Sequence, residues 1–85
     1  MQSGLMARPL HTSLHRKLRG LLVEWRHAAG LTQAETALRM GKAQSFVSKY
    51  ETGERRLDVV EFIEVCRTLN KEPEAAIAQL LQRAA

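Results

Sequence analysis

Three glycines divide the middle of the chain at nearly even intervals, at positions 30, 41 and 53. Each follows a segment whose apolar residues recur at the spacing of an amphipathic helix. Glycine readily enters the left-handed backbone conformation that ends many helices. A chain with this pattern is expected to form short helices joined by tight turns, and 85 residues allow one small domain.

The apolar periodicity predicts an all-α fold, a compact bundle of five helices without strands. The expected helices cover residues 13–29, 33–40, 43–52, 58–70 and about 73–84. Residues 1–12, which contain Gly4 and Pro9 and no sustained period, are predicted to form a flexible arm. Residues 13–85 then make up the single domain.

Helix-capping residues support these boundaries. Thr32 and Glu35 have the spacing of a capping box, Asp58 is a good N-cap, and Pro73 suits a first helical turn. Ala43 provides no side-chain cap for the helix that follows it. Trp25, Leu38, Phe62 and Leu69 are expected to belong to the core, and Cys66 lies on the apolar stripe of the fourth helix.

Composition argues against several classes of protein. The sequence contains no apolar run long enough for a membrane span and no secretory leader pattern, so a cytoplasmic protein is expected. Cys66 is the only cysteine, which excludes an internal disulfide and a cysteine-based zinc site. His11 and His15 have a helical metal-ligand spacing without a third ligand. We therefore expect no metal, no cofactor and no enzymatic activity.

The formal net charge of +4 is distributed unevenly. Residues 1–30 carry five cations and one anion, residues 31–57 five and three, and residues 58–85 three and five. A polarised chain of this kind can present a basic face to a polyanion. An ordinary solvated surface has the same composition, so charge alone does not identify a partner.

The two short helices on either side of Gly41 form a helix-turn-helix arrangement over about residues 32–52. The residues in and around it resemble those of the lambda-repressor-like helix-turn-helix family, also called the XRE family, of bacterial and phage regulators. The matching positions are Leu31-Thr32-Gln33-Ala34-Glu35, Ala37, Gly41, Gln44-Ser45-Phe46-Val47-Ser48-Lys49-Tyr50-Glu51 and Gly53. This resemblance implies a five-helix domain that binds a near-palindromic double-stranded DNA operator as a homodimer.

The second helix of this motif has two different sides. Val47 and Tyr50 are spaced to face the core, which leaves a polar side that is nearly free of acid. Amide, hydroxyl and ammonium groups of this kind hydrogen-bond to base edges in the major groove. The predicted base contacts are Gln44, Ser45, Ser48 and Lys49. Phe46 lies among them, where it either contacts a thymine methyl group or covers the turn.

Phosphate contacts are expected around this helix, because most protein–DNA hydrogen bonds go to the backbone of the DNA. Gln33 lies at a helix N-terminus, where free amides and the helix dipole favour a phosphate, and the family uses this glutamine for that purpose. The predicted phosphate contacts are Thr32, Gln33, Lys42, Arg55 and Arg56. Arg8 and His11 can extend the basic surface within the arm.

The resemblance also implies a partly buried ion pair between Arg26 and Glu51 that orients the recognition helix. The sequence departs from the family pattern at three positions, Thr36, Lys42 and Ala43. The family has an apolar residue at the first two and a capping Ser or Thr at the third. Thr36 and Ala43 are therefore expected to weaken the motif locally without preventing the fold.

A recognition helix reads only a few base pairs, so dimerisation is expected to add affinity. The candidate dimer contacts are Ile77, Leu80 and Leu81, which share one side of the last helix. The predicted function is sequence-specific transcriptional regulation. The alternative is an antitoxin or another interaction module that binds a protein partner and regulates its own operon.

Overall fold

The structure is a computed structural model that describes residues 12–82. Within this range the chain forms five helices and no strand: α1 (Ser13–Ala28), α2 (Gln33–Met40), α3 (Gln44–Thr52), α4 (Val59–Thr68) and α5 (Pro73–Leu81). The predicted all-α fold class is confirmed. Arg8 and His11 lie outside the described residues, and so do the last three residues of the chain.

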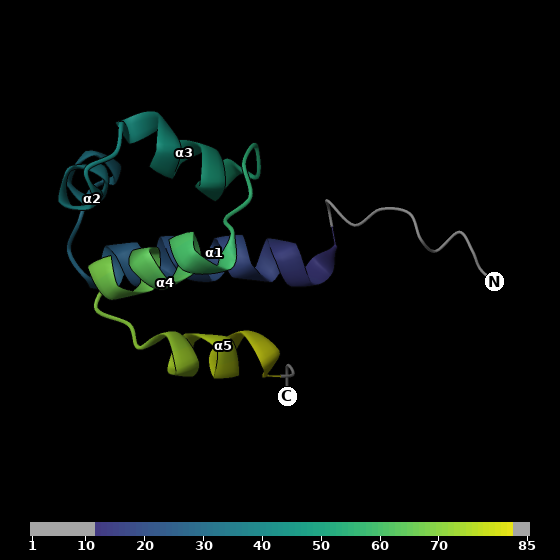
Figure 1. The fold of residues 1–85 in the computed structure, drawn as a ribbon. Coiled ribbons are helices and arrows are strands. Elements are labelled where there is room, and N and C mark those ends of the chain that lie inside the picture. Colours follow the sequence, from purple (N-terminus) through teal and green to yellow (C-terminus); the bar gives the residue numbers. More distant parts are fainter. Residues whose placement is uncertain (1–11, 83–85) are drawn as a thin grey trace.

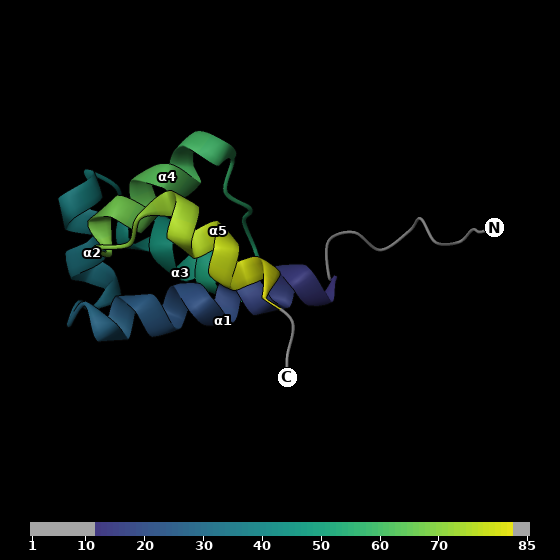
Figure 2. The same ribbon diagram turned by 90° about the horizontal axis from the view of Figure 1, so that it is seen from below.

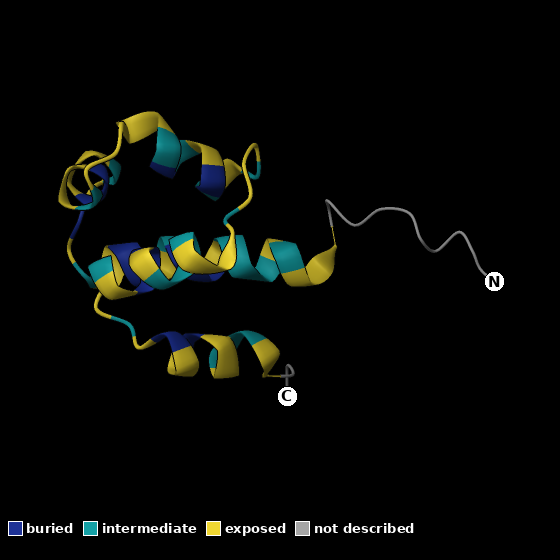
Figure 3. Cartoon of the chain, viewed as in Figure 1, coloured by how far each residue is buried: buried dark blue, intermediate teal, exposed yellow. Residues whose placement is uncertain are grey.

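The helices are arranged around a middle layer formed by α1 and α4. In Figure 1, α2 and α3 lie above this layer and α5 lies below it. Seen from below, α5 lies over α1 and α4 with α3 behind it (Figure 2). The outer sides of α3 and α5 are exposed, whereas their buried residues face the middle layer (Figure 3). The helix-turn-helix and the last helix therefore present opposite surfaces of the molecule.

Side-chain caps fix where three of the helices begin. In the Thr32 capping box the Glu35 amide donates to Thr32 Oγ1 at 3.0 Å, and the Thr32 amide donates to Glu35 Oε1 at 2.9 Å. A second capping box, which was not predicted, joins Asp58 to Glu61. Thr12, predicted as part of the arm, accepts a hydrogen bond from the His15 amide and is the N-cap of α1.

The glycines end their helices as expected. Gly41 and Gly53 adopt left-handed conformations with φ of 69° and 90°, and Gly30, with φ of 73°, follows the end of α1. Helix α5 is shorter than predicted. It ends at Leu81, and Gln82 is already extended with ψ of 134°, so the predicted end near residue 84 is wrong.

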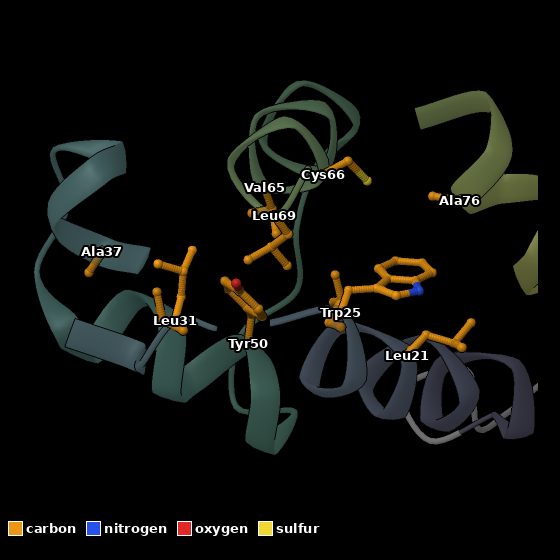
Figure 4. Packing of buried hydrophobic residues seen from close by; sticks show 11 residues of the cluster. Leu21, Trp25, Leu31, Ala37, Tyr50, Val65, Cys66, Leu69 and Ala76 are labelled. Carbon is orange, nitrogen blue, oxygen red and sulfur yellow. The ribbon is translucent and has the colours of Figure 1, made fainter. Parts of the chain in front are cut away.

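The core lies between the middle layer and the helices on either side of it. Trp25 packs near Cys66 and Ala76, and Tyr50 points toward Val65 and Leu69 (Figure 4). Ala37 is almost completely buried, and this small side chain allows α2 to approach its neighbours closely. These contacts connect all five helices through one cluster, which consists of Leu21, Leu22, Trp25, Leu31, Ala37, Val47, Tyr50, Val65, Cys66, Leu69 and Ala76.

One of the residues predicted to lie in the core is exposed. Leu38 is 80% exposed, because α2 turns Thr36 and Ala37 inward and the next position points to solvent. Val59 and Val60 are also exposed, because they occupy the first turn of α4, before that helix reaches its packed neighbours. The apolar period correctly predicted the helices, whereas the buried position expected for Leu38 is wrong.

Candidate nucleic-acid interface

Helix α3 presents a polar side to solvent and an apolar side to the core. Val47 and Tyr50 are buried, whereas Gln44, Ser45 and Lys49 are exposed. Ser48, the fourth predicted base contact, is half-buried, and its hydroxyl donates to the Ser45 carbonyl at 3.3 Å. The structure thus brings the four predicted base-reading residues onto one helix, with Gln44 in its first turn.

A polar network connects this helix to α1 and α2. Arg26 Nε donates to Glu51 Oε2 at 2.7 Å, and Arg26 Nη2 donates to Glu51 Oε1 at 3.2 Å. Gln33 Nε2 donates to the same Glu51 Oε1 at 2.8 Å, and Gln44 Nε2 lies 3.5 Å from Gln33 Oε1. The first exposed residue of α3 is therefore linked through Gln33 and Glu51 to a cation in the core.

The ion pair at the base of this network is shielded from solvent. The side chains of Arg26 and Glu51 are 11% and 5% exposed. Arg26 Nη1 also donates to the Leu31 carbonyl at 3.0 Å, so the guanidinium holds both the end of α3 and the segment that leads into α2. A buried charge pair with these hydrogen bonds restricts orientation more than it adds net stability, because desolvation offsets much of the attraction.

A groove of about 600 Å³ runs beside the start of α2. The residues that begin α2 line this groove, and the free amides and dipole of a helix N-terminus favour an anion. The groove contains Gln33 and Gln44, a predicted phosphate contact and a predicted base contact. Its lining residues are Arg26, His27, Gly30, Leu31, Thr32, Gln33, Ala34 and Gln44.

The remaining predicted phosphate contacts lie near the two ends of α3. Lys42 is exposed in the turn that precedes the helix, and Arg56 is exposed in the loop that follows it. Arg55 is held differently, because its guanidinium forms a two-pronged ion pair with Glu61 at 2.8 and 3.0 Å. The sequence pattern gave no indication of this pair.

Phe46 covers the turn instead of pointing outward with the polar residues. Its ring is half-buried and packs against the core, with an edge-to-face contact to Tyr50 at a centroid distance of 5.6 Å. Lys42 Nζ and Arg55 Cζ lie 5.1 and 4.7 Å from the ring centroid. Of the two roles that the sequence allowed for Phe46, the structure favours the covering one.

The pKa values of the two glutamates in the capping boxes are lowered, which favours their charged forms. Hydrogen bonds from the Thr32 backbone and side chain lower the pKa of Glu35. The hydrogen bond from Arg55, followed by that from the Asp58 backbone, lowers the pKa of Glu61 to about 2. Burial instead raises the pKa of the Cys66 thiol to about 11, which keeps this group protonated and unreactive near neutral pH.

The predicted dimer contacts lie on the opposite side of the molecule from α3. Leu81 is 66% exposed, Ile77 is exposed and Leu80 is half-buried. An apolar groove of about 240 Å³ separates them from the start of α4. Its lining residues are Leu18, Leu57, Asp58, Val59, Phe62, Ile77 and Leu80.

The structure places His15, one of the two histidines with a metal-ligand spacing, next to Arg19. His15 Nδ1 lies 3.0 Å from Arg19 Nη1. A cation beside this nitrogen disfavours a bound metal, and among residues 12–82 no cluster of three metal-ligating side chains occurs. None of the helices that the structure describes is long and apolar enough to cross a membrane.

Comparison with known proteins identifies the class to which this fold and surface belong. A helix-turn-helix family model matches residues 22–75. A solved structure of an XRE-family like protein from Pseudomonas syringae pv. tomato str. DC3000 is 46% identical in sequence and superposes with a TM-score of 0.83. The match covers 92% of this chain and 94% of that one. No curated protein matches the sequence.

The chain therefore belongs to the XRE-like helix-turn-helix family. The class is one of DNA-binding transcription regulators. The resemblance inferred from the sequence is confirmed.

Proposed function

We propose that the protein is a cytoplasmic regulator that binds a near-palindromic operator as a homodimer, with α3 in the major groove. The observation that carries this proposal is the hydrogen-bonded connection from Gln44 through Gln33 and Glu51 to the buried Arg26. A base-reading side chain discriminates between bases only when its position is fixed. This network supplies that restraint at the first turn of the recognition helix.

In this proposal the polar side of α3 reads bases and its surroundings bind phosphates. Gln44 is suited to a bidentate contact with adenine, and Lys49 to guanine or phosphate. Ser45 and Ser48 add less selective contacts. The proposed phosphate contacts are Thr32, Gln33, Lys42 and Arg56. Arg55 is left out of this set because its guanidinium is already paired with Glu61.

Dimerisation through α5 completes the proposal. Two recognition helices placed about 34 Å apart can read two half-sites one helical turn apart on the DNA. The exposed Ile77 and Leu81 are the proposed contacts with the second copy.

The function is tested by selecting duplexes from a random-sequence library with the full chain and measuring their affinity against a scrambled duplex. We expect one symmetric sequence to be enriched and to bind at least about 10³-fold more tightly than scrambled DNA. Affinity should fall steeply with salt, because bound phosphates release counterions. Absence of enrichment, or equal affinity for both duplexes, would overturn the proposal.

The dimer is tested separately by sedimentation of Leu81→Glu. We expect this variant to sediment as a monomer, because a carboxylate in an apolar interface is costly to desolvate. Ala75→Glu is the matched control, since it adds the same charge to an exposed position on another side of α5. If Leu81→Glu remained as dimeric as the control, the proposal that α5 forms the dimer interface would be wrong.

A further inference from the structure

The loop that follows the recognition helix is held by a cluster around Phe46. The ring lies within cation–π distance of Lys42 in the turn before α3 and of Arg55 in the loop after it. It also contacts Tyr50, the buried anchor of α3. A single half-buried aromatic side chain therefore connects the turn before α3 with the loop after it.

Arg55 contacts three separate parts of the chain. Its guanidinium lies over Phe46 in α3, donates to the Arg56 carbonyl in the loop at 3.0 Å, and forms both hydrogen bonds to Glu61 in α4. The Arg55 amide donates to the Lys49 carbonyl at 3.1 Å, so its backbone is also attached to the end of α3. Planar two-pronged contacts of this kind fix direction as well as distance.

The acid that receives Arg55 is itself held in place. Glu61 Oε1 accepts from the Asp58 amide at 3.0 Å, and the Glu61 amide donates to Asp58 Oδ1 at 2.7 Å. Its carboxylate therefore caps α4 and binds Arg55 at the same time. The start of α4 and the end of α3 are connected through this one carboxylate.

We propose that Arg55 is a positioning residue that fixes the recognition helix relative to α4, with Phe46 and Glu61 as its partners, and that it does not bind DNA phosphate. The proposal rests on the function proposed above. It assigns to Phe46 and Glu61, which lie outside the polar side of α3, an effect on operator recognition.

An opposite account explains the same contacts. If Arg55 binds phosphate in the complex, Glu61 competes with the DNA for the guanidinium and weakens binding. The two accounts predict opposite changes in operator affinity for one substitution. Removing the Glu61 charge should impair operator binding if Arg55 acts by positioning, and should improve it if Glu61 masks a phosphate contact.

The decisive variant is Glu61→Gln, tested in the full chain on the selected operator. Glutamine retains the capping box, because its amide oxygen can still accept from the Asp58 amide, so the fold should be preserved. We expect operator affinity to fall about ten-fold, which is the size of effect expected when the interaction between two contacting residues is lost. This fall should occur although the net positive charge of the protein increases. Affinity for scrambled DNA should stay constant or rise.

A salt titration provides the second measurement. In the positioning account, Arg55→Ala weakens operator binding and leaves the slope of log affinity against log salt unchanged. Arg56→Ala, the neighbouring proposed phosphate contact, should lower that slope by about 0.9. Arg55→Lys keeps the positive charge but cannot form the two-pronged contact of a guanidinium with Glu61. Its operator affinity should therefore be as low as that of Arg55→Ala.

Phe46→Leu extends the test to the other partner. It preserves an apolar side chain of similar bulk and removes the ring from beneath the guanidinium, so operator affinity should fall while affinity for scrambled DNA does not. Tighter operator binding by Glu61→Gln, or a reduced salt slope for Arg55→Ala, would overturn the inference. Failure of the unmodified chain to prefer any duplex would instead reject the proposed function.

Discussion

The two outer surfaces of this molecule are held to its middle layer by different kinds of contact. The helix-turn-helix side adds to its apolar packing a charged network in which Arg26 and Gln33 both donate hydrogen bonds to Glu51. The α5 side is held chiefly by apolar packing around Trp25, Cys66 and Ala76. Side-chain hydrogen bonds add to it, from Trp25 Nε1 to Gln79 Oε1 at 3.3 Å and from Lys17 Nζ to the Gln82 carbonyl.

This difference matches what each surface is proposed to do. Hydrogen bonds are directional, so a polar network fixes the angle at which α3 presents its side chains. Apolar packing is less directional, and the same side leaves Val59, Ile77 and Leu81 exposed. A surface that must read base edges requires orientation, whereas one that meets a second copy requires apolar area.

The largest predicted effect comes from breaking the charged network. Glu51→Ala leaves the Arg26 charge buried without its partner, and we expect the free energy of unfolding to fall by about 3 to 5 kcal/mol. Chemical denaturation measures this loss. Glu54→Ala, an exposed acid three residues further along the chain, should change the stability by no more than about 0.5 kcal/mol.

A double-mutant cycle sharpens the result. Replacing Arg26 and Glu51 together by apolar residues of similar volume should cost much less than Glu51→Ala alone, because no unpaired charge remains. Additive effects, with an interaction free energy near zero, would mean that the two side chains are solvated independently. The Arg26–Glu51 pair would then not be what holds the helix-turn-helix side, and the contrast between the two surfaces would be wrong.

Tyr50 provides a smaller test at the border between the two surfaces. Its hydroxyl is buried, and among the described residues it has no hydrogen-bond partner. Burial raises the pKa of this phenol above its usual range. Tyr50→Phe should therefore increase the free energy of unfolding by about 1 kcal/mol, because it removes an unsatisfied polar group. Thermal denaturation measures this gain. A loss of stability would show that this hydroxyl is hydrogen-bonded.

The smallest expected effect concerns the start of α3. Ala43 occupies the N-cap position and makes no side-chain capping hydrogen bond. Ala43→Ser should add about 0.5 to 1 kcal/mol to the free energy of unfolding, since the serine hydroxyl can accept from a free amide of the first turn. Ala78→Ser, at an exposed position inside α5, is the control and should not stabilise the protein. Equal effects would exclude a capping contribution.

Features that depend on neighbours in the sequence were predictable. The helix ends at Gly41 and Gly53 and the Thr32 capping box follow from local chemistry, and each is present in the structure. Thr36 also shows how a departure from the family pattern is accommodated. Its side chain is buried, and its hydroxyl donates to the Thr32 carbonyl at 2.9 Å.

Features that depend on the path of a loop were not predictable. Arg55 and Glu61 meet because the α3–α4 loop folds back, and no periodicity in the sequence encodes that path. The inward position of Phe46 follows from the same geometry. Leu38 was misplaced because a short helix has few inward positions, and Thr36 and Ala37 already occupy them. The Arg26–Glu51 pair was expected only through the family resemblance.

We propose that the orientation of α3 makes Gln44 a base-reading residue. Binding titrations of Gln44→Ala on the selected operator and on scrambled DNA test it most directly, with Gln82→Ala at an exposed position outside the motif as the control. We predict a loss of about 1 to 3 kcal/mol on the operator, relaxed discrimination at one base pair, and no loss on scrambled DNA. An equal loss on both duplexes would make Gln44 a backbone contact and contradict this account.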